Sequence, residues 1–173
     1  MKVIRQLVVA TGVLMLVACG AERDEPFDPG SDDEDDEPRE RISVRRIIND
    51  DQTLLAIDGD RQTLVFRDED TYFTFLDRYT DLGVANEPNF ETSQVVLIDL
   101  GERADDSCDY QLNLETIVAE VVNEDVGEVI LEYSERQPVE SEDCPDEAAE
   151  NIRPFYFYSV ATRRTLLISE ELR

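Results

Sequence analysis

The sequence has no histidine, no tryptophan and only one lysine, Lys2, among its 173 residues. Without histidine the protein has no imidazole that acts as a general acid or base, or that binds zinc. The charge is also one-sided, because 42 Asp and Glu stand against 16 Lys and Arg, for a formal net charge of −26. Nucleic-acid binding requires clustered Lys and Arg, so this charge argues against a nucleic acid as partner.

What the chain does have is enough apolar material for one folded domain. Hydrophobic residues make up 41% of it, including six Tyr and seven Phe. A length of this order predicts one domain once a leader and a linker are set aside. The acidity is also typical of proteins adapted to salty surroundings, in which surface carboxylates keep the protein soluble.

Residues 1–18 have the organisation of a bacterial signal peptide. Lys2 and Arg5 precede an apolar run over residues 7–17, which is too short to span a bilayer but has the length of a signal-peptide core. The run ends in the sequence LVAC, whose last residue is Cys19. An ordinary secretory signal with a chance cysteine, or a short buried helix, are the alternatives.

The LVAC sequence resembles the lipobox of bacterial lipoproteins. This resemblance implies cleavage before Cys19, a thioether-linked diacylglyceryl group on its thiol and acylation, as with palmitate, of the new amino terminus. Several acyl chains on one residue anchor a protein stably, whereas one binds marginally. Gly20 stands where an aspartate signals retention in the inner membrane. We therefore expect a lipid anchor in the outer membrane of a Gram-negative cell, facing the periplasm.

Residues 19–40 are predicted to be a disordered acidic tether. The segment contains the run DDEDDE at residues 32–37 and three prolines, and Phe27 is its only large apolar residue. Such a composition buries too little surface to offset the entropy of ordering. The alternative is a cation-binding or partner-binding tail, although the run lacks the ligand spacing of a calcium loop.

Residues 41–173 are predicted to form one β-rich globular domain of the α+β class, mainly antiparallel. Short apolar runs alternate with turn signals, as in antiparallel sheets. Runs 53–57 and 63–66 flank the sequence DGD at residues 58–60 and predict a hairpin. The expected strands span residues 42–48, 53–57, 63–66, 94–100, 110–114, 116–122, 128–133, 155–160 and 165–169.

One amphipathic helix is predicted over residues 70–81. Its aromatic and leucine side chains recur at helical spacing between Tyr72 and Tyr79. The acidic residues 68–70 suit the positive end of a helix dipole, and Gly83 is expected to end the helix. Such an aromatic stripe indicates a helix face that packs on the core.

Two strands carry a clear burial pattern. The apolar run at residues 95–98 does not alternate, which predicts a central strand covered on both faces. The sequence FYFY at residues 155–158 predicts two Phe on one face and two Tyr on the other.

The remaining cysteines, Cys108 and Cys144, are predicted to form a disulfide. An exported pair is expected to oxidise, and lipidation of Cys19 leaves a single pairing. A metal-binding pair and a catalytic thiol are the alternatives. A reactive thiolate requires a cationic neighbourhood, whereas both cysteines lie among acidic residues.

From about Thr71 onward the order of features resembles the PrcB-type domain, named for a lipoprotein subunit of a spirochaete surface-protease complex. The matching pieces are the aromatic helix, the strand VVLI at residues 95–98, QLNL at residues 111–114, VILEY at residues 129–133 and RPFY at residues 153–156. The family usually has two glycines before the tyrosine that corresponds to Tyr110, and this chain has Cys108 and Asp109 there. The resemblance implies a non-enzymatic accessory or scaffold domain and carries over no catalytic residue.

These observations favour a lipid-anchored envelope lipoprotein that binds or scaffolds another exported protein. We expect no catalytic residue, no cofactor and no metal. The first alternative is a hydrolase that uses two carboxylates, but no pair stands out from the acidic surface. The second is a calcium-responsive module, with Asp58-Gly59-Asp60 and Asp105-Asp106 as its local candidates.

Overall fold

The computed structural model describes residues 38–81, 83, 87–104, 110–137 and 150–173. All of them belong to one compact unit, Glu37–Arg173. Its elements are, in chain order, β1 (Arg41–Ile42), β2 (Val44–Asp50), β3 (Gln62–Phe66), α1 (Glu69–Tyr79), β4 (Gln94–Asp99), β5 (Arg103–Ala104), β6 (Gln111–Val121), β7 (Val126–Arg136), β8 (Asn151–Ile152), β9 (Phe155–Val160) and β10 (Thr165–Leu172).

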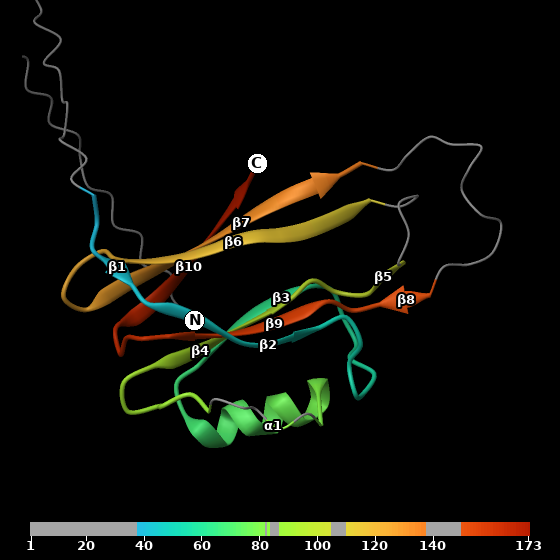
Figure 1. The fold of residues 1–173 in the computed structure, drawn as a ribbon, viewed down its shortest axis with the longest axis horizontal. Coiled ribbons are helices and arrows are strands. Elements are labelled where there is room, and N and C mark those ends of the chain that lie inside the picture. The colour runs from blue at the N-terminus through green and yellow to red at the C-terminus, as the bar shows by residue number, and fades with distance from the viewer. Residues whose placement is uncertain (1–37, 82, 84–86, 105–109, 138–149) are drawn as a thin grey trace, which may run out of the picture. The chain divides into compact units, whose positions relative to one another are not determined.

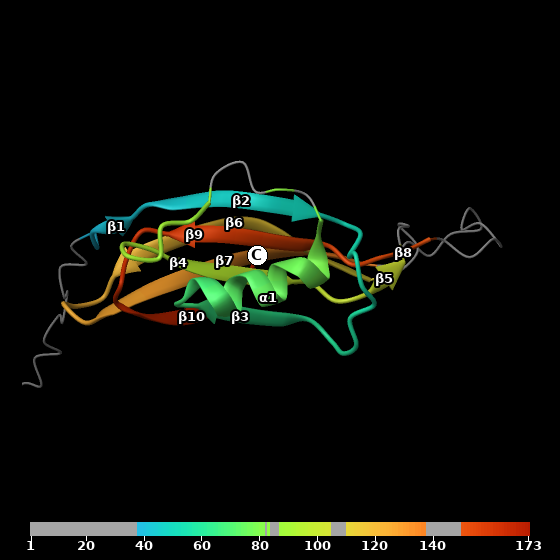
Figure 2. The ribbon, with the colours of Figure 1, turned by 90° about the horizontal axis from the view of Figure 1, so that it is seen from below.

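The strands form two four-stranded sheets, and the helix covers one of them (Figure 1). Sheet A has the order β1-β6-β7-β10, sheet B has the order β2-β9-β4-β3, and β5 pairs with β8 in a small separate ladder. Figure 2 shows α1 lying across the face of sheet B that points away from sheet A. The layers are therefore sheet, sheet and helix, and the predicted class of a mainly antiparallel α+β domain is confirmed.

Helix α1 forms where the aromatic pattern predicts it, two residues shorter at its end. The Asp68 side chain accepts a hydrogen bond from the Thr71 amide at 2.8 Å and so caps the amino terminus. The prediction that Gly83 ends the helix is wrong. Thr80 adopts an extended conformation instead, and the amides of Leu54 and Leu55 donate to the last carbonyls of the helix.

This use of Leu54 and Leu55 also explains why the predicted hairpin is wrong. Residues 53–57 form no strand, because their backbone turns toward the end of the helix. Only the second half of the hairpin exists, as β3, and it pairs with β4 rather than with its predicted neighbour. The sequence DGD indicated a turn at residues 58–60. Which strands pair on either side of that turn depends instead on contacts with α1 and β4, which are distant in the sequence.

The predicted strand over residues 42–48 is divided between the two sheets. Ile42 pairs with Ala119 of β6 in sheet A, whereas Val44 pairs with Val160 of β9 in sheet B. The chain crosses from one sheet to the other at Ser43. The sandwich is thus joined at this margin by a continuous backbone.

Sheet A contains two further departures from the predicted strands. The runs at residues 110–114 and 116–122 are one strand, β6, with an irregularity between Leu114 and Thr116. Strand β10 pairs parallel with β7, from Thr165 opposite Val126 to Leu172 opposite Tyr133. It is the one parallel ladder among the described strands.

Two hydrophobic cores hold the layers together. The first lies between the sheets and includes Val96, Ile98, Leu131 and Val160. The second lies between sheet B and α1 and is built from Ile57, Phe66, Tyr72, Leu76, Tyr79, Val95, Leu97, Phe155 and Phe157. Every residue of β4 is buried, which confirms the predicted central strand.

Strand β9 contributes to both cores through its alternation. Phe155 and Phe157 are fully buried against the helix, and Tyr79 meets both rings edge-on at centroid distances of 5.0 and 5.5 Å. Tyr156 and Tyr158 pack on the other side, against the core between the sheets. The predicted division of the FYFY sequence into two faces is confirmed.

Candidate functional site

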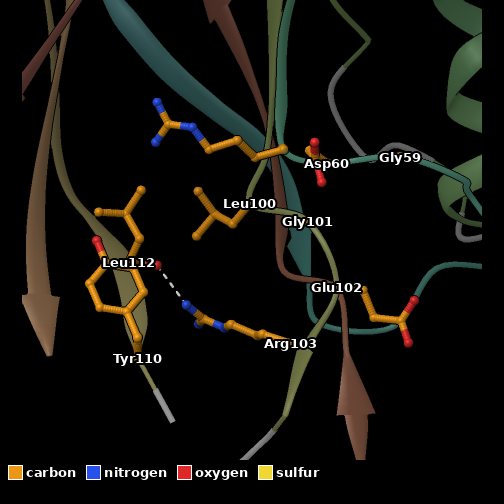
Figure 3. A pocket seen from close by; sticks show the side chains of 9 residues that line it. Gly59, Asp60, Leu100, Gly101, Glu102, Arg103, Tyr110 and Leu112 are labelled. Carbon is orange, nitrogen blue, oxygen red and sulfur yellow. Dashed lines mark hydrogen bonds between the residues drawn. The ribbon is translucent and has the colours of Figure 1, made fainter. Parts of the chain in front are cut away.

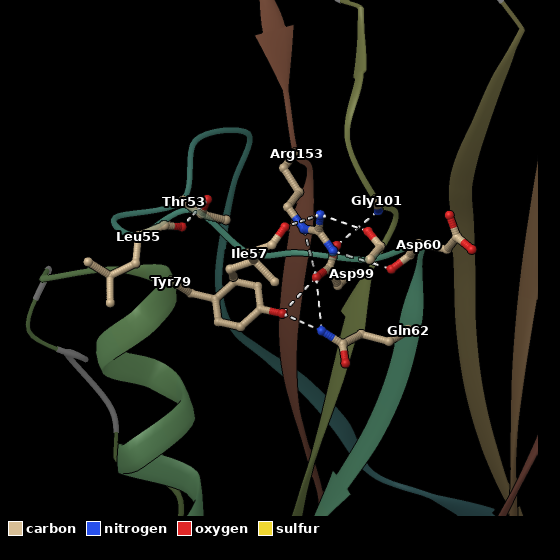
Figure 4. Close-up of polar contacts among 10 residues, drawn as sticks. Thr53, Leu55, Ile57, Asp60, Gln62, Tyr79, Asp99, Gly101 and Arg153 are labelled. Atoms are coloured by element: carbon tan, nitrogen blue, oxygen red, sulfur yellow. Dashed lines mark hydrogen bonds and ion pairs between the residues drawn. The ribbon is translucent and has the colours of Figure 1, made fainter.

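The described residues contain one buried ion pair, Arg153 with Asp99. Nε of Arg153 lies 3.0 Å from Oδ2 of Asp99, and the two side chains are 6% and 0% exposed. The same carboxylate oxygen accepts hydrogen bonds from the Tyr79 hydroxyl at 2.7 Å and from Gln62 at 3.3 Å (Figure 4). Its other oxygen accepts from the Gly101 amide at 2.9 Å. A buried carboxylate requires such a complete set of donors.

The guanidinium of Arg153 also fixes the loop that precedes β3. It donates to the carbonyl of Ile57 at 2.9 Å, of Gly59 at 3.2 Å and of Asp60 at 3.3 Å. Figure 4 shows the Ile57 and Asp60 carbonyls facing the guanidinium. The Arg153 side chain therefore connects the segment just before β9 to the end of β4 and to the loop at residues 57–60.

Burial and this network keep Tyr79 protonated. Desolvation, and then the hydrogen bond to Asp99, raise the pKa of the Tyr79 hydroxyl far above its usual value. The hydroxyl donates to the Asp99 carboxylate and accepts a hydrogen bond from the Gln62 side-chain amide at 3.0 Å. The cluster is closed on itself, since each of its charged groups is bonded to another part of the fold, and it serves as a structural anchor.

Next to this anchor is a surface pocket of about 550 Å³. Arg153 and Asp99 shape it indirectly, because they hold the loop and the glycine at its rim. Its walls are shown in Figure 3 and consist of Gly59, Asp60, Arg61, Leu100, Gly101, Glu102, Arg103, Tyr110 and Leu112. The volume lies in the range of small-ligand and side-chain pockets, about 300–1,000 Å³.

The pocket is built where the end of β4 meets the first residues of β6. Arg103 donates to the Leu112 carbonyl at 2.5 Å and to the Asn113 side chain at 3.2 Å, which joins the two walls. Gly101 has a φ of +79°, and a Cβ there would lie 3.1 Å from the Arg61 amide nitrogen. Only glycine fits this position without strain.

Charges of both signs line the pocket beside apolar side chains. The hydroxyl of Tyr110 donates to Glu135 at 2.6 Å, and this bond raises the pKa of Tyr110. Arg61 lies over the Tyr133 ring, 5.2 Å from its centroid, and pairs with Glu170. The walls thus suit a partner's mixed polar and apolar side chains better than a compact anion.

The structure tests one of the two cation candidates from the sequence and gives it no support. The backbone of Asp58-Gly59-Asp60 bonds to Arg153, so its Gly59 and Asp60 carbonyls already have a donor. Asp105 and Asp106 lie outside the described residues. Within the described ranges no three Cys, Asp or Glu side chains gather as metal ligands.

The three cysteines also lie outside the described residues. This holds for Cys19, predicted to carry the lipid, and for Cys108 and Cys144, predicted to form a disulfide. The predicted signal peptide and nearly all of the predicted tether fall there too. The helix of the described part is neither long nor apolar enough to cross a membrane.

Comparison of the chain with protein-family models, with curated proteins and with solved structures finds no match in any of the three. The resemblance to the PrcB-type domain therefore remains a prediction.

Sequence reasoning missed the pair of Arg153 and Asp99. A signal was present, because Asp99 is the one charged residue between Val95 and Leu100 in an otherwise apolar run. A carboxylate in a strand covered on both faces must be paired. The identity of its partner, 54 residues further along the chain, depends on the fold.

Proposed function

We propose that this protein is a lipid-anchored envelope lipoprotein that binds and supports another exported protein. The anchor is the lipid on Cys19 predicted from the LVAC sequence, in the outer membrane and facing the periplasm. The acidic segment 19–40 is the spacer between the anchor and the domain. The domain acts as an accessory subunit, as in the protease complex suggested by the PrcB-type resemblance.

The observation that carries the binding role is that both sheets end in edge strands. We call the unpaired outer side of such a strand, within the described residues, an open margin. Each sheet ends in strands that pair on one side only within the described part of the chain. Exposed strand margins bind extended segments of other proteins through their backbone groups. The pocket between Gly101 and Tyr110 adds a place for a partner's side chain.

The way the buried charges fix a surface loop agrees with a supporting role. The charged cluster of Arg153 and Asp99 is used to fix a loop, and its groups are bonded within the protein. Rigid loops and strands lower the entropy cost of binding a partner.

Affinity purification from crosslinked envelope extracts tests this function. The expected result is one exported protein recovered in a stoichiometric amount with the wild-type chain. A Cys19→Ser variant, which keeps the domain, is the matched control for anchoring, and should leave the membrane fraction. If the wild-type chain recovers no partner above the level of an unrelated lipoprotein, the binding role is wrong.

A further inference from the structure

We infer that the open margin of β10 is the docking site, and that it takes an extended, basic segment of the partner protein as an added strand. This inference rests on the proposed binding function and specifies its surface and ligand. Strand β10 is the last strand in the order of sheet A, where Figure 1 shows it beyond β7.

The backbone of β10 offers a regular row of hydrogen-bonding groups. The amides of Thr165 and Arg173 donate to the Asp125 and Tyr133 carbonyls, so alternate residues from Thr165 onward face β7. Because successive residues of a strand point their backbone groups to opposite sides, the others face away from the sheet. These outward residues are Leu166, Ile168, Glu170 and Leu172.

The other three margins are each protected in a way that β10 is not. Strand β2 has an irregularity between Arg46 and Ile48. Strand β6 has one next to Glu115, and β1 covers part of its length. Strand β3 has five residues and leads almost directly into α1. Bulges, short strands and covering segments are the usual means of blocking strand addition.

Strand β10, in contrast, keeps one register with β7 through all its eight residues. Two of its apolar side chains are exposed, Leu167 at 51% and Leu172 at 60%. An unbroken margin with exposed apolar side chains is what an added strand requires.

The charge around β10 selects a basic occupant. Glu171 lies directly opposite Glu132 in the ladder, and like charges in this position repel. Arg173 pairs with Glu132 at 2.6 Å, but among the described contacts no arginine pairs with Glu171. A Lys or Arg of the added strand beside Glu171 relieves this repulsion.

The same charge opposes a second copy of this chain as occupant. Each copy carries a net charge of −26, so two copies repel each other, whereas a basic segment is attracted. The partner segment therefore alternates apolar and basic residues, with the basic ones on the outer face beside Leu167 and Glu171.

A peptide of about nine alternating valines and arginines, enough to span β10, tests the inference with the full-length protein. Hydrogen exchange is the direct readout. On binding, hydrogen exchange at the four outward-facing amides should slow by about tenfold or more, because each amide gains a hydrogen-bond acceptor. These amides belong to Leu166, Ile168, Glu170 and Leu172. No binding, or binding without this alternating protection, overturns the assignment of β10.

Two variants make the test specific. Leu167→Arg should weaken peptide binding about tenfold, whereas Leu54→Arg, at an equally exposed leucine far along the chain, should leave it unchanged. Glu171→Arg should reverse the preference for peptide charge, so that a valine–glutamate peptide binds better than the valine–arginine one. Equal effects of the two leucine variants, or an unchanged preference, contradict the inference.

Envelope pull-downs with the same variants separate this inference from the proposed function. If a partner is recovered equally with the wild type and with Leu167→Arg, the binding function stands and the β10 assignment is wrong. If Leu167→Arg alone loses the partner, the assignment is supported. If the wild type recovers none, the function itself is wrong.

Discussion

Replacing Arg153 by leucine should lower the free energy of unfolding by about 3–5 kcal/mol. The change removes the charge that faces the Asp99 carboxylate at 3.0 Å, at a site where both side chains are nearly inaccessible. The carboxylate keeps its bonds from Tyr79 and Gly101 but remains a buried, uncompensated charge. The carbonyls of the loop at residues 57–60 lose their donor as well, which adds to the cost.

Urea unfolding followed by far-ultraviolet circular dichroism measures this loss, and tyrosine fluorescence provides a second probe because the chain lacks tryptophan. The double variant Asp99→Leu with Arg153→Leu removes both charges. It should be more stable than the sum of the two single losses predicts, because the single variants each leave a buried charge.

The control is Arg39→Leu, which removes an ion pair with Glu128 whose arginine side chain is half exposed. Such a surface pair contributes about 0–1 kcal/mol. A loss for Arg153→Leu no larger than that of this control would contradict the buried ion pair's role in stability, and so would simple addition of the two single losses in the double variant.

Three further predictions concern the pocket rim, the core and the cysteines. Gly101→Ala should cost about 1–3 kcal/mol because of its positive φ, whereas Gly83→Ala, in open space, should change stability by a few tenths; urea midpoints compare them. Burial, and then Glu170, raise the pKa of Tyr133 to about 12, so the folded state retains this proton longer than the unfolded state does. Stability should fall as the pH rises from 10 to 12, by about 1.4 kcal/mol per unit from this group, and Tyr133→Phe should reduce that slope. Cys108→Ser should cost roughly 4 kcal/mol under oxidising conditions and little in reductant, if Cys108 pairs with Cys144; equal losses in both conditions contradict the disulfide.

Local patterns predicted the elements whose contacts are local or whose burial is extreme. Helix α1 is evident because its aromatic side chains recur at helical spacing and Asp68 caps it. The all-buried β4 and the alternating β9 are evident for similar reasons. In these segments the burial pattern follows directly from the order of the residues.

The rest depends on contacts between distant segments. The change of sheet at Ser43 and the parallel pairing of β10 with β7 have no local signal. Leu54 and Leu55 resemble strand residues, yet their amides are used by the last turn of α1. The margin at β10 could likewise not be located before the order of the strands was known.

We propose that a lipid on Cys19 holds this protein in the envelope, and every other part of the proposed function depends on it. Mass spectrometry of the protein purified from membranes tests it most directly. We expect a chain that begins at Cys19 and carries a diacylglyceryl group on sulfur and an acyl group on its amino terminus. A chain that retains residues 1–18, or whose Cys19 has an unmodified thiol, would contradict it.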